Sequence, residues 1–100
     1  MTIEETYGSR ELERDYGPLT FGGALWAHRK GEELSQKKFA EFLEISSSSL
    51  CDIEKGRKIP SPRRAARIAR HIGHPEIPWV QLALQDMLRQ EGLGYTVSVA

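Results

Sequence analysis

The chain has 100 residues, of which 39% are hydrophobic, and 14 basic residues balance 14 acidic ones to give a formal net charge of +0. This size and composition are typical of one soluble domain, and so small a domain is often helped by oligomerisation, so we expect a dimer. The single cysteine excludes an internal disulfide. Because neither a signal peptide nor an apolar run long enough to span a bilayer stands out, we expect a cytoplasmic protein.

The opening stretch of the chain is polar and acidic. Against two arginines it has five acids, which are Glu4, Glu5, Glu11, Glu13 and Asp15. We expect residues 1–18 to be mobile or to be ordered by a partner. The first helix should begin near Phe21 and run to about Lys30 with Leu25 facing inward, although Gly22 and Gly23 weaken its start.

The segment from Gln36 to Gly56 has the apolar spacing of two short helices joined by a tight turn. In the first of these helices Phe39, Ala40 and Leu43 fall on one face, because residues three and four apart lie side by side on an α-helix. Small Ala40 sits where two helices of a compact helix-turn-helix must approach closely. This face is therefore predicted to point into the core.

The second helix of this segment should run from about 47 to 55, because Ser46 is a good N-cap and Gly56 a good residue after the helix end. Leu50 and Ile53 face inward. The opposite face is polar and carries Ser47, Ser48, Cys51, Asp52 and Lys55. Such a face suits the DNA major groove, so it is the candidate reading surface.

A basic run follows this helix and contains no acid. Its members are Lys55, Arg57, Lys58, Arg63, Arg64, Arg67 and Arg70. Ser61 and Pro62 mark the start of a further helix, on which Arg63, Arg67 and Arg70 share one face. This face either contacts DNA phosphates or is a solvated arginine face. Because basic and acidic residues are segregated along the chain, the net charge of zero does not argue against a polyanionic partner.

The C-terminal helix, from Pro78 to Gln90, is apolar over roughly half its circumference. One side should pack on the domain and another on a second subunit, or all of it fills the monomer core. The tail YTVSVA then alternates in the manner of a short strand. Its backbone could pair with the tail of a second chain, with the N-terminus near Ile3 or with a different protein, or it could be frayed. The residues predicted at a dimer or partner interface are Trp79, Leu82, Met87, Tyr95, Val97 and Val99.

Other chemistry is weakly supported. His71, His74 and Glu76 lie close in the sequence, but Gly73 and Pro75 interrupt the helix and no further ligand completes a metal site. Cys51 lacks a local catalytic context, and no phosphate loop or paired-acid motif is present. We therefore expect no enzyme activity, no metal and no cofactor, while oxidation sensing by Cys51 and an inert thiol both stay open.

Three segments together resemble the lambda-repressor-like, or Xre, family of helix-turn-helix DNA-binding proteins, over about half of the chain. They are LSQKKFAEFLEIS, SSSLCDIEKGRKIPS and RRAARIARHIG. The resemblance implies an all-α, lambda-repressor-like fold with the helix-turn-helix DNA-binding domain over residues 19–74. Residues 75–100 lie beyond the resemblance, and their own pattern predicts the C-terminal helix, the fifth helix of the chain, and a tail with a possible short β-strand. Glu44 stands where the family usually has glycine in the turn, and a non-glycine residue at positive φ costs on the order of 1 kcal/mol.

Carried over by position, the resemblance also implies site residues. Arg29 and Glu54 match a structural pair that links the first helix to the recognition helix. The base-facing positions are Ser47, Ser48, Cys51 and Asp52. We expect DNA-backbone contacts from Gln36, Lys37, Ser46, Lys55, Arg57, Lys58 and Arg63. Serine pairs with either base and aspartate suits only a cytosine amino group, so direct readout should be weak.

We predict a bacterial or phage transcription regulator, acting as a homodimeric repressor on an inverted repeat of double-stranded DNA. One alternative is an antitoxin of a type II toxin-antitoxin module, which binds a toxin protein and represses its own operon. A second alternative is a protein interaction module that does not bind DNA.

Overall fold

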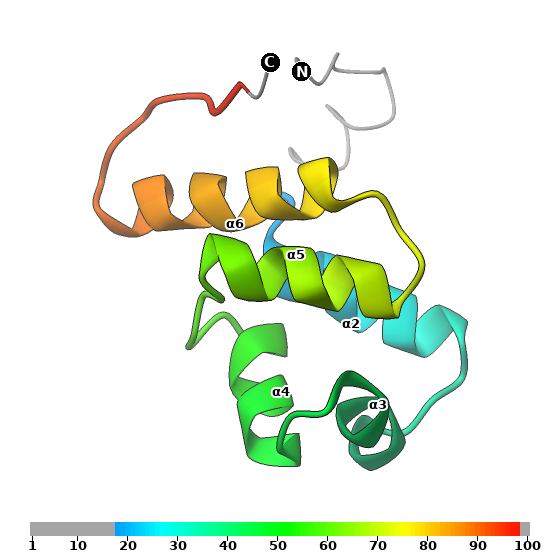
Figure 1. Cartoon of the computed structure of the whole chain (residues 1–100). Coiled ribbons are helices and arrows are strands. Elements are labelled where there is room, and N and C mark those ends of the chain that lie inside the picture. The colour runs from blue at the N-terminus through cyan, green and yellow to red at the C-terminus, as the bar shows by residue number, and fades with distance from the viewer. Residues whose placement is uncertain (1–17, 99–100) are drawn as a thin grey trace.

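The computed structural model describes residues 18–98, and this part of the chain forms five helices and no strand (Figure 1). The helices are α2 (Phe21–Gly31), α3 (Gln36–Leu43), α4 (Ser47–Glu54), α5 (Pro62–His71) and α6 (Glu76–Gln90). The predicted all-α class is confirmed, and the predicted first and recognition helices match α2 and α4 to within one residue at each end. Nearly all of the acidic N-terminal segment, and Val99, lie outside the described residues.

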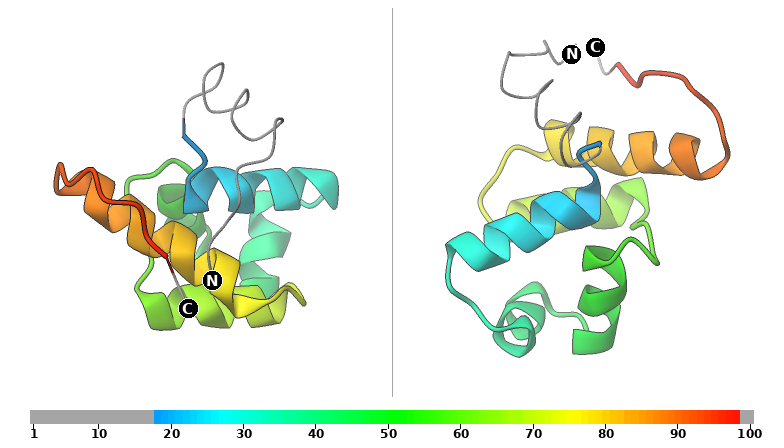
Figure 2. Two further views of the ribbon diagram at one scale, coloured as in Figure 1. Left: turned by 90° about the horizontal axis from the view of Figure 1, so that it is seen from above. Right: turned by 180° about the vertical axis from the view of Figure 1, so that it is seen from behind.

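The helices are stacked so that α3 and α4 lie at one end of the domain and α6 at the other (Figure 1). The reverse view gives the same order, with α2 and α5 between the two ends (Figure 2). The closest packing of α6 is on α5 and α2, whereas α4 packs on α2 and α3. The largest fully buried side chains are Phe21, Phe39, Leu25, Leu43, Leu50 and Ile53. The candidate reading helix and the C-terminal helix are therefore separated by the core.

Hydroxyl side chains fix the starts of four helices. At each start the hydroxyl oxygen accepts a hydrogen bond from the backbone N–H three residues later. These capping residues are Thr20, Ser35, Ser46 and Ser61. Each such cap typically stabilises a helix by about 1 kcal/mol. The fifth helix, α6, begins after Pro75 without a side-chain cap.

Glu44 ends α3 in the left-handed conformation, with φ 59° and ψ 40°. This confirms that the turn requires a positive φ at the position where the sequence lacks glycine. The carboxylate of Glu44 accepts a hydrogen bond from Arg67 Nη2 at 3.1 Å and lies 3.5 Å from His71 Nε2. These contacts join the turn to α5 and help to hold the strained residue in place.

Gly22 allows α2 to approach the end of α4 without a side chain between them. A Cβ atom at this position would clash with the carbonyl oxygen of Ile53 and would lie 3.0 Å from that of Glu54. The sequence suggested only that Gly22 weakens the start of the helix. Its structural role is instead a close contact between two backbones, which only glycine permits.

Trp79 and Asp86 anchor α6 to the rest of the domain. The Trp79 ring packs edge-to-face on Phe21 with ring centroids 5.3 Å apart and is only 7% exposed. Asp86 Oδ2 accepts a hydrogen bond from the backbone N–H of Phe21 at 2.9 Å, so a carboxylate from α6 sits at the start of α2. Trp79 is therefore a core residue of the monomer, which corrects its expected place at a partner interface.

Beyond α6 the chain turns at Gly92, which has φ 73°, and runs back alongside α6 (Figure 1). Residues 93–98 form no strand, because no neighbouring strand in the described part of the chain offers a hydrogen-bond ladder. Their backbone is bonded to side chains of α6 instead.

We expect Gly22→Ala to destabilise the protein by about 1–3 kcal/mol or more, because the added methyl group meets a backbone carbonyl that cannot move aside easily. The matched control is Gly31→Ala at the end of the same helix, where no atom lies within 4 Å of the added Cβ. The control should be neutral or slightly stabilising. Free energies of unfolding from urea titrations check this, and equal stability of Gly22→Ala and wild type would contradict the proposed contact.

Candidate nucleic-acid interface

The recognition helix α4 is divided into two faces as its sequence predicts. Leu50 is 0% exposed and Ile53 is 1% exposed, so they anchor the helix in the core. On the other face Ser47 and Ser48 are exposed, while Cys51 and Asp52 are half-buried. The capping hydroxyl of Ser46 lies at the exposed start of this helix. Because the Ser46 oxygen accepts from Ser49, its own hydrogen is left to donate to a phosphate.

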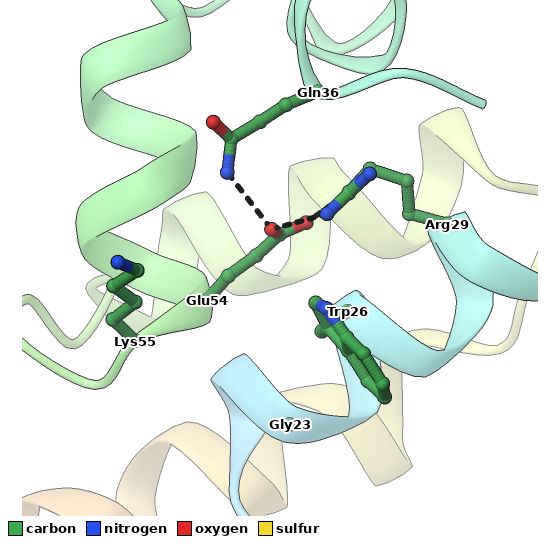
Figure 3. Close-up of a pocket in the computed structure, with 6 residues that line it drawn as sticks. All are labelled: Gly23, Trp26, Arg29, Gln36, Glu54 and Lys55. Carbon is green, nitrogen blue, oxygen red and sulfur yellow. Dashed lines mark hydrogen bonds and ion pairs between the residues drawn. The ribbon is translucent and has the colours of Figure 1, made fainter.

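A buried ion pair fixes α4 against α2. Arg29 donates from Nε to Glu54 Oε2 at 2.7 Å and from Nη2 to Glu54 Oε1 at 3.1 Å, so the pair is bidentate (Figure 3). The side chains are only 10% and 3% exposed. Arg29 Nη1 also donates to the carbonyl of Leu34 at 3.0 Å. This ion pair is the structural link that was expected between the first helix and the recognition helix.

Gln36 adds α3 to this network. Its side-chain Nε2 donates to Glu54 Oε1 at 3.1 Å (Figure 3). The backbone N–H groups of Gln36 and Lys37, at the start of α3, have no hydrogen-bond partner among residues 18–98. A helix N-terminus with free N–H groups favours a negatively charged ligand, so this point of α3 is suited to a phosphate.

Asp52 and Arg57 form an ion pair on the outer face of α4. Arg57 Nε donates to Asp52 Oδ1 at 2.9 Å, and its Nη2 lies 3.5 Å from Cys51 Sγ. The backbone N–H groups of Arg57 and Lys58 both donate to the carbonyl of Asp52, which folds the following loop back onto the helix. The hydrogen bond with Asp52 raises the pKa of Arg57 above its ordinary value. Arg57, expected at the DNA backbone, thus lies beside two of the expected base-facing residues.

The basic run is partly neutralised by acids from other elements. Arg67 is paired with Glu44, and Arg70 Nη1 donates to Glu76 Oε1 at 2.8 Å. The exposed cations without an ion pair to any described residue include Lys55, Lys58 and Arg63 from this run, and Lys37 at the start of α3. These four remain the candidates for phosphate contacts.

Trp26 is a surface residue that the sequence did not single out. Together with Gly23, Arg29, Gln36, Glu54 and Lys55 it lines a hollow between α2, α3 and α4 (Figure 3). The indole is 48% exposed, and Lys30 Nζ lies 5.9 Å from the centre of its ring. The spacing of Trp26 and Lys30, four residues apart on one helix, is the only sequence signal for this contact.

Within residues 18–98 no group of three or more His, Cys, Asp or Glu residues could hold a metal ion. None of the helices described is long and apolar enough to cross a membrane.

Comparison with curated proteins gave no match, and comparison with solved structures gave none either. A family model described as a helix-turn-helix domain matches residues 20–77. This range covers more than half of the chain and contains α2, α3, α4 and α5 together with the connection to α6. The chain therefore belongs to the helix-turn-helix domain family, in agreement with its resemblance to the lambda-repressor-like proteins.

Proposed function

We propose that this protein is a sequence-specific DNA-binding transcription regulator, and that it acts as a homodimeric repressor on an inverted repeat in the cytoplasm of a bacterium. The observation that carries the proposal is the exposed polar face of α4, held by the buried Arg29–Glu54 pair and flanked by cations that form no ion pair with any residue of 18–98. In a dimer each recognition helix enters a major groove about 34 Å from its twin.

The contacts divide into those that position the protein and those that read the bases. Lys37, Lys55, Lys58 and Arg63, with the start of α3, are assigned to phosphates, which set affinity and its salt dependence. Ser47 and Ser48, at the exposed start of α4, are assigned to base edges. The ion pair with Arg57 occupies Asp52, so readout by hydrogen bonds is limited and DNA shape or bridging water supplies part of the specificity.

The experiment that tests this proposal directly is a titration of the full chain with DNA from its own promoter region and with scrambled DNA of equal length, over a series of salt concentrations. We expect saturable binding that prefers the promoter and falls steeply as salt rises. No preference for promoter DNA at any salt concentration would overturn the proposal and favour a protein interaction module that does not bind DNA. The cations that form no ion pair with the described residues argue against such a module.

Substitutions should separate the two classes of contact. Lys55→Ala combined with Lys58→Ala should weaken binding to both DNAs. The plot of log K against log salt should become shallower, its slope falling in magnitude by about 0.9 for each phosphate that the variant no longer neutralises. Ser48→Ala should leave that slope unchanged and alter preference at one base-pair position. If both variants weaken binding to all DNA sequences equally, the assignment of the lysines to phosphates and of Ser48 to a base edge is wrong.

Asp52→Asn is expected to tighten binding to promoter and scrambled DNA alike. The change removes a negative charge from the reading face and releases Arg57, which can then contact a phosphate and steepen the salt dependence. The control is Asp52→Asn with Arg57→Ala, which should lose most of the gain if the two residues are coupled. Weaker binding by Asp52→Asn would instead mean that the carboxylate itself contacts DNA.

An antitoxin is the second candidate function. It is favoured by the C-terminal tail, which lies beyond the family match and exposes Leu93 by 42% and Tyr95 by 65%. Exposed apolar side chains on a tail are suited to binding a toxin protein. Stable co-purification with the product of an adjacent gene, and loss of that product's toxicity on co-expression, would establish this role.

A further inference from the structure

Two glutamines of α6 bind the backbone of the C-terminal tail. Gln85 Nε2 donates to the carbonyl of Tyr95 at 2.7 Å, and Gln85 Oε1 accepts from the N–H of Val97 at 2.9 Å. One helical turn earlier, Gln81 Nε2 donates to the carbonyl of Val97 at 2.7 Å. The side-chain amides therefore take the place that a neighbouring β-strand would occupy.

The spacing of the two glutamines matches an extended segment that runs antiparallel to the helix. Four residues of an α-helix rise about 6 Å, and two residues of an extended strand span about 6.6 Å. Glutamines at i and i+4 can thus bind alternate residues of such a strand. Gln81 is only 6% exposed, and its Oε1 is the one buried side-chain nitrogen or oxygen in the described chain that has no hydrogen-bond partner.

This arrangement leaves the outer edge of the tail unpaired at Thr96. In an extended strand the N–H and C=O groups of successive residues point to opposite edges. The groups of Tyr95 and Val97 that bind α6 lie on the inner edge, so those of Thr96 lie on the outer edge, where they have no hydrogen bond to the described residues. From Gly92 to the end the sequence contains no charged residue and no proline. The edge therefore lacks the features that normally protect an exposed strand.

We propose that this edge pairs with the same segment of a second copy of the chain. The two tails would run antiparallel about a twofold axis at Thr96, and the two Thr96 residues would exchange both of their N–H···O=C hydrogen bonds. Gln81 and Gln85 are positioning residues, which keep each tail extended against its own α6. This inference rests on the homodimer proposed above and assigns its contact surface.

A second copy is the occupant that fits this edge best. The segment is self-complementary, since one residue supplies both a donor and an acceptor, and its lack of charge avoids repulsion between identical tails. Leu84 and Leu88 lie on the same face of α6 as the two glutamines and are half-buried without belonging to the core cluster. With exposed Tyr95 they supply apolar surface beside the hydrogen bonds. Pairing here leaves α4, at the other end of the domain, uncovered (Figure 1).

The test compares Thr96→Pro with Thr96→Ala in the full chain. Proline removes the outward N–H and keeps Tyr95 extended, so the bonds to Gln81 and Gln85 are preserved. Alanine removes the same side chain but keeps the N–H. By sedimentation equilibrium over a concentration series, Thr96→Pro should raise the dimer dissociation constant roughly thirty-fold, as expected when two hydrogen bonds are removed, and Thr96→Ala by less than about three-fold.

Gln85→Met, which keeps the side-chain length but cannot bind the tail, should also weaken the dimer, and thermal unfolding confirms that each variant is folded. A dimer insensitive to Thr96→Pro would overturn tail pairing and leave the homodimer standing on another surface. Equal weakening by proline and alanine would overturn the backbone pairing. A wild-type chain that is monomeric throughout would overturn both the pairing and the homodimer, while DNA binding is measured independently.

Discussion

The buried pair of Arg29 and Glu54 is the interaction on which the rest of the structure depends. Two opposite charges removed from water are tolerated only when their hydrogen bonds are satisfied, and here α2, the loop before α3, and α3 itself all contribute to that satisfaction. Removing one partner of such a pair typically costs about 3–5 kcal/mol. The pair therefore holds three helices in one relative orientation, and the outward face of α4 is a consequence of that orientation.

The helix α2 transmits this constraint to the opposite end of the domain. At its start the backbone N–H of Phe21 is held by Asp86 of α6, and Gly22 contacts the end of α4, while Arg29 holds Glu54 near its other end. Both the end of the domain that carries α4 and the C-terminal end are thus attached to one rigid element. A ligand or second subunit at α6 has a physical connection to the recognition helix through α2, because closely packed interiors transmit displacement.

Much of the fold could be predicted because it depends on neighbours in the chain. Helix starts follow from hydroxyl residues such as Ser46 and Ser61, and the positive φ of Glu44 follows from the turn that two short helices require. The pairing of Arg57 with Asp52 could not be predicted, nor could that of Arg67 with Glu44, because a charge run does not reveal which acids fold against it. The role of Gln81 was hidden for a similar reason, since an amide on a helix normally indicates an exposed surface.

The two tryptophans of this chain lie in opposite environments. Trp79 is enclosed in the core against Phe21, whereas Trp26 is half-exposed in the hollow beside Gln36 and Lys55, next to the cations assigned to DNA phosphates. The fluorescence of Trp79 reports whether the domain is folded, and the fluorescence of Trp26 reports the binding of a ligand at the surface. The molecule therefore contains two intrinsic optical reporters that distinguish loss of structure from the arrival of a ligand.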